Sequence, residues 1–292
     1  MTAPAVRSRK VAAGSDPLVM VTAYDAPGAR MVDEAGADLI LVGDSLAMVV
    51  LGYEDTLQVT VEDMAHHTAA VARTKPSALV VADLPWLSYH VSIEDTVRNA
   101  AVLVRAGASA VKLEGGHKRV SAVRALVDAE IPVMGHIGLT PQSIHAMGGF
   151  KVQGKDAGAA LALVEEAKAL VAAGVFAIVL EGVPDAVAKL VTDAVPVPTI
   201  GIGAGRHCDG QVLVFHDVLG LEDRIAPKFV RRYAALKADG VAALAAFAAD
   251  VRSGAFPDDT ESYHLPAASL EALGLSDRDD HEVMALYGSM SA

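Results

Sequence analysis

Short runs of apolar, mostly β-branched residues alternate with longer stretches of helical periodicity along most of the chain. Such runs, bounded by polar residues or glycine, predict buried strands. Eight candidates follow one another, and the last of them is weak: 19–22, 39–42, 78–82, 110–113, 131–135, 177–180, 199–202 and a stretch near Val218.

The stretches between these runs carry helix start and stop signals. Thr60 and Asp63 form a capping-box-like pair, and Gly107 and Gly174 follow predicted helix ends. The predicted helices span 26–34, 61–73, 93–106, 120–128, 157–173 and 183–191. Strands that alternate with helices pair in parallel through right-handed crossovers. An α/β fold with eight such strands favours a closed (β/α)8 TIM barrel over the alternative, an open doubly wound sheet.

The predicted domain organisation is a single barrel domain over residues 1–292, because no Pro-rich or Ser-rich linker divides the chain. Residues 228–254 are rich in Ala and Val and predict C-terminal helices. The pattern weakens after Gly254. We expect residues 258–292 to form a mobile tail or an arm used in oligomerisation.

The charge and cysteine content narrow the class of protein. With 24 Lys and Arg against 36 Asp and Glu, the formal net charge is −12, which argues against nucleic acid and anionic membranes as partners. The single cysteine, Cys208, excludes an internal disulfide framework. No secretory signal and no apolar run of membrane-spanning length is evident, so a cytoplasmic protein is expected.

Acidic residues stand where four of the predicted strands end. They are Asp44, Asp83, Glu114 and Glu181. The carboxyl ends of parallel strands meet on one face, and carboxylates that converge there need a shared cation or proton. Each acid alone is more typical of a helix cap or a turn. Asp44, Asp83 and Glu114 together favour a hard divalent cation such as Mg²⁺.

Lys112 and Glu114 lie two residues apart in a predicted strand, so their side chains point to the same side. Val111 and Leu113 suit packing against the outer helices, which predicts that Lys112 and Glu114 point into the barrel. A buried structural ion pair is the alternative. Charged groups inside a barrel near its mouth are costly, and this favours a functional role.

Other candidates carry weaker signals. Glu181 ends an apolar strand, where a carboxylate suits a general base, although an exposed strand-end acid is equally compatible. His136 also ends a strand, whereas the adjacent His66 and His67 are expected to be surface or packing residues. The glycine-rich segment 201–205 follows the seventh strand, where barrel phosphate sites occur, but the signal is weak.

Eight segments run in order through most of residues 18–257 and are specific as a set: 42–46, 49–53, 82–85, 111–116, 135–142, 151–154, 180–181 and 201–205. Taken together, these segments resemble the ketopantoate hydroxymethyltransferase family. Ala47 and Gly182 are small departures from the family pattern, and the tail beyond about residue 264 lies outside the resemblance.

The resemblance implies a (β/α)8 barrel of the phosphoenolpyruvate/pyruvate-domain type that requires Mg²⁺ and commonly assembles as a homo-oligomeric decamer. It also implies 5,10-methylenetetrahydrofolate as one-carbon donor and 3-methyl-2-oxobutanoate as acceptor, in pantothenate biosynthesis. The roles carried over by position are metal binding for Asp44, Asp83 and Glu114; substrate binding for Asp44, Ser45, Asp83 and Lys112; a general base at Glu181; and a supporting role for His136.

Two other functions are also compatible with the sequence. The first is a metal-dependent C–C lyase or phosphonomutase of the phosphoenolpyruvate-utilising barrel class, which uses similar acids. A requirement for folate would distinguish a hydroxymethyltransferase from this class. The second is a non-catalytic barrel that binds a keto acid, and observed turnover would exclude it.

Overall fold

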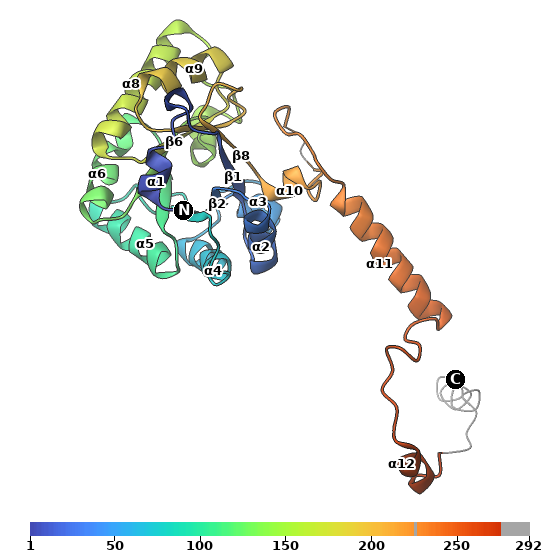
Figure 1. Cartoon of the computed structure of the whole chain (residues 1–292). Helices are drawn as coiled ribbons and strands as arrows, with labels where there is room; N and C mark the ends of the chain where they lie inside the picture. The colour runs from blue at the N-terminus through green and yellow to red at the C-terminus, as the bar shows by residue number, and fades with distance from the viewer. Residues whose placement is uncertain (225–226, 276–292) are drawn as a thin grey trace. The chain divides into compact units, whose positions relative to one another are not determined.

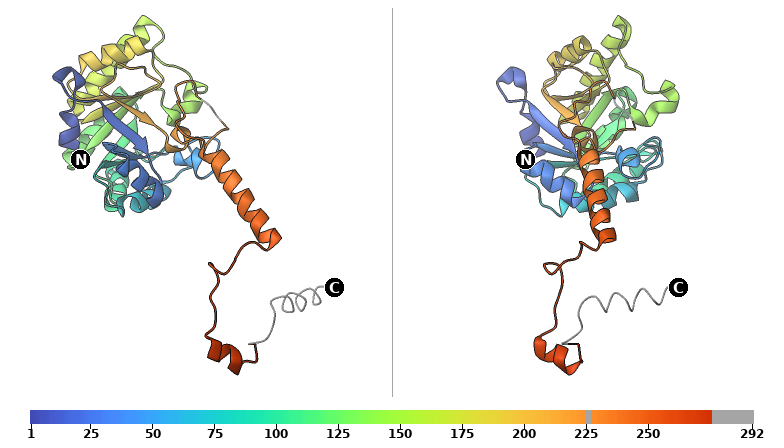
Figure 2. Two further views of the ribbon diagram at one scale, coloured as in Figure 1. Left: turned by 45° about the vertical axis from the view of Figure 1, so that its right-hand side comes forward. Right: turned by 90° about the vertical axis from the view of Figure 1, so that its right-hand side faces the viewer.

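The computed structural model describes residues 1–224 and 227–275. Eight parallel strands close into a barrel in sequence order, with helices on the outside (Figures 1 and 2). This confirms the predicted (β/α)8 barrel and rules out the open sheet. The strands are β1 Leu18–Thr22, β2 Leu39–Val42, β3 Leu79–Asp83, β4 Ala110–Glu114, β5 Val133–Gly138, β6 Ala177–Glu181, β7 Thr199–Ile202 and β8 Gly210–Leu213.

Side chains cap the starts of two of the predicted helices, and the capping box predicted at Thr60 and Asp63 is confirmed. Thr60 and Asp63 form a reciprocal capping box at the start of α4, and the Ser92 side chain caps α5. The helices are α1 Ala3–Arg7, α2 Ala26–Glu34, α3 Leu46–Val49, α4 Val61–Ala72, α5 Ile93–Arg105, α6 Val120–Asp128, α7 Ile144–Met147, α8 Ala157–Ala173, α9 Asp185–Ala194, α10 Phe215–Val218, α11 Leu236–Ser253 and α12 Ala267–Ala272, with 3₁₀ turns at Val11–Ala13, His117–Arg119 and Pro141–Ser143.

Two sequence-based boundaries were wrong. The eighth strand is β8, not a strand near Val218, which instead ends α10. Leu18 pairs with Gly210 and Val21 with Leu213, and this register closes the barrel. The C-terminal helix α11 begins at Leu236 rather than at 228. The preceding residues are held by backbone bonds to the end of α10, from Tyr233 N–H to the Val218 carbonyl and from Leu236 N–H to the Leu219 carbonyl, instead of helical ones.

Strand alternation separates two apolar layers. Every second residue of each strand points into the barrel and fills its interior, while the alternate residues pack under the helices. Val6 of α1 joins the interior cluster, so this helix covers one end of the barrel. The interior residues on the strands are Leu18, Met20, Leu39, Leu41, Leu79, Val81, Ala110, Met134, Ala177, Val179, Ile200 and Val212.

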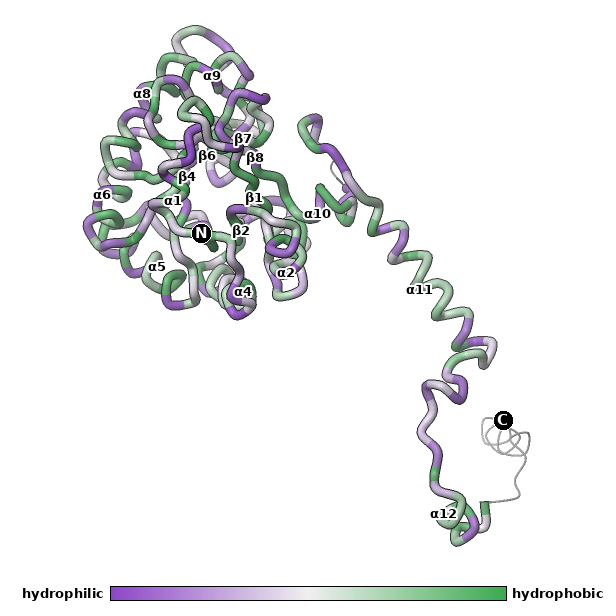
Figure 3. Tube along the Cα trace, in the orientation of Figure 1, coloured by the Kyte–Doolittle hydropathy of each residue, from purple (hydrophilic) through white to green (hydrophobic). Residues whose placement is uncertain are grey.

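The chain divides into two compact units, Met1–Leu236 and the part that starts at Lys237. The second unit contains most of α11, along which hydrophobic and hydrophilic positions interleave in Figure 3. Of the tail predicted for 258–292, residues 276–292 lie outside the described residues, and α12 forms within the remainder. Throughout residues 1–224 and 227–275, no helix combines the length and apolar character needed to cross a membrane.

Candidate active site

The alternation that fills the barrel also directs charged side chains inward at the carboxyl ends of the strands. Asp83 on β3 and Lys112 on β4 are register partners, and Lys112 Nζ lies 3.0 Å from Asp83 Oδ1. Val111 and Leu113 belong to the outer layer, so the predicted inward direction of Lys112 and Glu114 is confirmed. Both members of the Asp83–Lys112 pair are buried, so each depends on the other for charge compensation.

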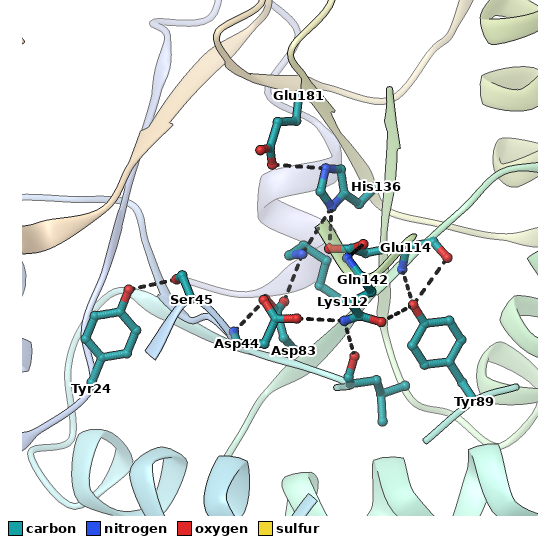
Figure 4. A network of polar contacts seen from close by, with 11 residues as sticks. Tyr24, Asp44, Ser45, Asp83, Tyr89, Lys112, Glu114, His136, Gln142 and Glu181 are labelled. Carbon is teal, nitrogen blue, oxygen red and sulfur yellow. Dashed lines mark hydrogen bonds and ion pairs between the residues drawn. The ribbon is translucent and has the colours of Figure 1, made fainter. Parts of the chain in front are cut away.

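Asp44 follows β2 and lies beside this pair, as Figure 4 shows. Its backbone N–H donates to Asp83 Oδ2 at 3.1 Å. Burial, followed by repulsion from Asp83 and Glu114, raises the pKa of Asp44 well above its ordinary value. Burial also raises the pKa of Asp83, although Lys112 opposes the change. The two aspartates therefore have more negative charge around them than one lysine neutralises.

Glu114, His136 and Glu181 form a chain across β4, β5 and β6. His136 Nδ1 lies 3.3 Å from Glu114 Oε1, and its Nε2 lies 3.3 Å from Glu181 Oε2. Burial and Lys112 both favour neutral His136, but Glu114 and Glu181 outweigh them and raise its pKa to about 9. Burial disfavours ionised Glu114, yet His136 and Lys112 outweigh it and lower its pKa. The imidazole is thus held as a cation between two carboxylates in the metal-free protein.

A glycine makes the approach of β5 to β6 possible. Gly138 pairs with Glu181 in the register and has φ of +97°. A Cβ at this position would lie 2.3 Å from the Glu181 carbonyl oxygen. Any other residue would therefore push apart the two strands that carry His136 and Glu181.

Sequence reasoning missed two residues that bind this cluster together. The Gln142 side-chain amide donates to Asp44 Oδ2 at 2.8 Å, and its backbone N–H donates to Glu114 Oε2 at 3.0 Å. Tyr89 donates its hydroxyl to Gln142 Oε1 at 2.5 Å. Gln142 ends the matched segment 135–142, but nothing in the local pattern distinguishes it from an ordinary loop residue.

Ser45 and the cluster face one cavity of about 420 Å³. The Ser45 hydroxyl lies 2.8 Å from the hydroxyl of Tyr24. All seven predicted site residues line the cavity: Asp44, Ser45, Asp83, Lys112, Glu114, His136 and Glu181. The structure therefore brings together the residues that the sequence grouped, while their individual roles stay predictions.

The donor set suits a hard divalent cation. The buried carboxylates of Asp44 and Asp83 lie side by side at the cavity, with pKa values raised mainly by burial. Over residues 1–224 and 227–275, no group of three or more His, Cys, Asp or Glu side chains is arranged to hold a metal ion together. Mg²⁺ commonly takes only one or two protein carboxylates and fills its other positions with water or substrate oxygens, so an aspartate pair fits it.

Two other sequence candidates play structural parts. His67 Nδ1 lies 2.7 Å from the backbone carbonyl of Tyr24, a packing role as expected. In the glycine-rich segment, Gly203 has φ of +61°, and a Cβ there would meet the Phe229 ring at 2.8 Å. This loop is therefore shaped by close packing, which weakens the reading of it as a phosphate site.

The fold and the cluster of carboxylates, lysine and histidine at the barrel mouth define a (β/α)8-barrel enzyme. Within that class the chain belongs to the ketopantoate hydroxymethyltransferase family, whose model matches residues 2–259. The 3-methyl-2-oxobutanoate hydroxymethyltransferase of Clostridium acetobutylicum is 54% identical over 88% of this chain and 93% of its own length. The enzyme of the same name from Moorella thermoacetica is 58% identical over 84% of this chain and 92% of its own length. The predicted family and the hydroxymethyltransferase class are confirmed.

Solved structures support the fold alone. 2,3-Dimethylmalate lyase, a member of the PEP mutase/isocitrate lyase superfamily, superposes with a TM-score of 0.58 at 20% identity, covering 100% of this chain and 99% of that one. Phosphonopyruvate hydrolase in complex with oxalate and Mg²⁺ gives a TM-score of 0.58 at 15% identity, covering 99% of each chain. These likenesses agree with the (β/α)8 barrel expected from the sequence.

Proposed function

We propose that this chain transfers a one-carbon unit from 5,10-methylenetetrahydrofolate to 3-methyl-2-oxobutanoate, giving 2-dehydropantoate for pantothenate biosynthesis. One water is consumed and supplies the new hydroxyl oxygen, and tetrahydrofolate leaves. The observation that carries the proposal is the position of Glu181 on the wall of the same cavity as the Asp44 and Asp83 carboxylates. A base and a cation site share one chamber there, as enolisation of an oxo acid requires.

The oxo acid is proposed to bind at Ser45, Asp83 and Lys112. Asp44, Asp83 and Glu114 would hold Mg²⁺ directly or through water. When bound, the metal would act as a Lewis acid that stabilises negative charge developing on the 2-oxo oxygen. Burial alone would lower the pKa of Lys112, but the surrounding carboxylates raise it, so this residue remains a cation able to neutralise charge on the substrate.

Glu181 is proposed to remove the C3 proton. Its side chain is 18% exposed, whereas that of His136 behind it is 2% exposed, so Glu181 is the one that substrate can reach. His136 orients the Glu181 carboxylate from the side away from solvent. The C3 carbon would then form its new bond to the methylene carbon of the folate.

We further propose that the protein acts in the cytoplasm as a homo-oligomer, a decamer by the family resemblance. Four exposed apolar side chains lie on one side of α11: Val241, Leu244, Phe247 and Val251. A second copy of the chain would cover this stripe. Replacing Leu244 and Phe247 by Glu should lower the mass measured by light scattering, whereas Ala242→Glu on the opposite side should not.

The decisive test of the function is substrate consumption. Loss of 3-methyl-2-oxobutanoate should require both Mg²⁺ and methylenetetrahydrofolate, and the product should be 2-dehydropantoate. Consumption without folate would favour a C–C lyase, and binding without turnover would favour a keto-acid-binding barrel.

A further inference from the structure

The cavity is larger than an oxo acid of eight non-hydrogen atoms needs, and its lining is partly charged and partly apolar. Its volume of about 420 Å³ falls in the range of roughly 300–1,000 Å³ that suits drug-sized ligands. The charged cluster occupies one part of the lining. Another part is apolar and comes from Met48, Val49, Phe150, Val214 and Phe229. Phe150 and Phe229 are 52% and 41% exposed, which is high for aromatic rings facing a cavity.

Two acids, Asp217 and Glu222, also line this cavity. The Glu222 carboxylate forms an ion pair with Arg224, whose Nη2 lies 2.7 Å from Glu222 Oε2. Asp217, on α10, has no side-chain hydrogen bond within residues 1–224 and 227–275, although it is half-buried. Burial and then Glu222 raise its pKa, as expected for a carboxylate without donors. Its carboxylate is therefore free to accept hydrogen bonds from a ligand in the cavity.

We propose that Asp217 anchors the pterin ring of the folate co-substrate, with the ring packed against Phe150 and Phe229. This subsite rests on the proposed function. The pyrimidine part of a pterin carries two adjacent donors, N3–H and the 2-amino group, which match the two oxygens of one carboxylate. The flat ring suits aromatic walls. The same cavity holds Glu181, so a folate bound there would lie in one chamber with the enolised acid.

Asp217→Asn tests the anchor because it keeps the size of the side chain but replaces one acceptor oxygen with a donor. Tetrahydrofolate binding, measured by calorimetry, should weaken by roughly 10- to 100-fold, the range for a hydrogen bond to a charged group. p-Aminobenzoylglutamate, which lacks the pterin, should bind the variant and the parent alike. Asp128→Asn, on an exposed position of α6, is the charge-matched control and should leave both affinities at the parent value.

Phe150→Leu gives a second measurement on an exposed loop side chain, and it should also weaken tetrahydrofolate binding. Exchange of the C3 proton of 3-methyl-2-oxobutanoate with deuterated solvent, measured without folate, tests the proposed function separately from the pterin subsite. The pterin subsite would be wrong if both variants bound tetrahydrofolate as tightly as the parent and matched its rates of proton exchange and turnover. The proposed function would still stand in that case. A parent that binds no tetrahydrofolate at all would overturn the proposed function itself.

Discussion

His136 Nε2 lies 3.3 Å from Glu181 Oε2, so the proposed base has a buried imidazole directly behind it. The other ring nitrogen faces Glu114. One histidine therefore links the proposed base to the group of acids proposed to bind metal. The charge on this ring influences both ends of the chain.

The stability of the metal-free protein should fall between about pH 6.5 and pH 9. The pKa of His136 is raised from 6.5 to about 9, so its contribution is fully present below 6.5 and is lost as pH rises through 9. The loss is on the order of 3 kcal/mol, since one pKa unit corresponds to roughly 1.4 kcal/mol. Urea denaturation in EDTA at pH 6 and pH 9.5 measures it. A His136→Gln variant with the same pH slope as the parent would contradict this origin.

Asp83→Asn should weaken Mg²⁺ binding by at least about 10-fold, because even residues that only orient metal ligands commonly contribute that much. The isosteric amide keeps one acceptor oxygen for Lys112 and loses the acceptor of the Asp44 N–H, so the variant should still fold, as circular dichroism would show. Isothermal titration with Mg²⁺ measures the affinity, with Asp128→Asn as control. Unchanged Mg²⁺ affinity in alanine variants of Asp44, Asp83 and Glu114 would exclude the proposed metal site.

Lys112 should not form a Schiff base. Asp83 at 3.0 Å and the nearby Glu114 keep its ammonium group protonated, and a protonated amine is not a nucleophile. Borohydride added to enzyme and oxo acid should leave the mass of the protein unchanged. An adduct located at Lys112 by peptide mapping would place this protein among the metal-free aldolases.

Gln142→Ala should destabilise the fold by about 1–3 kcal/mol, the cost of leaving buried polar groups without partners. Asp44 would lose its amide donor and Tyr89 its acceptor, whereas the backbone bond from residue 142 to Glu114 is independent of the side chain. Thermal unfolding measures the change. Tyr89→Phe removes the bond to Gln142 Oε1 and also the acceptor of the Glu114 N–H, which lies 3.2 Å from the Tyr89 hydroxyl, but it leaves Asp44 with its amide donor. An unchanged unfolding temperature in Gln142→Ala would show that Gln142 does not act as the bridge.

The sequence was informative wherever the structure depends on short-range periodicity. Alternation within β4 was enough to predict that Lys112 and Glu114 point inward, and the ends of apolar runs located Asp83 and Glu181 at the barrel mouth. A strand has a period of two residues, so its local pattern determines which side chains share a face.

Features that depend on distant contacts were not predictable in this way. Gln142 reaches Asp44 across 98 residues and Tyr89 across 53, and no local pattern records either bond. The eighth strand was misplaced because Gly210 and Gln211 break the apolar run, while its position is set by pairing with β1. Barrel closure is a property of the whole sheet and overrides a weak local signal.

Glu181→Gln should separate binding from proton transfer. The amide keeps the size of the carboxylate and a hydrogen-bonding oxygen near His136, so oxo acid and Mg²⁺ should still bind. Exchange of the C3 proton with deuterated solvent, followed by NMR without folate, should fall by roughly 10²- to 10⁴-fold, the range for a lost general base. Glu165→Gln, an exposed acid on α8, is the matched control and should exchange at the parent rate. Parent-rate exchange in Glu181→Gln would assign the base elsewhere, and His136, which lines the same cavity 3.3 Å away, would be the next residue to test.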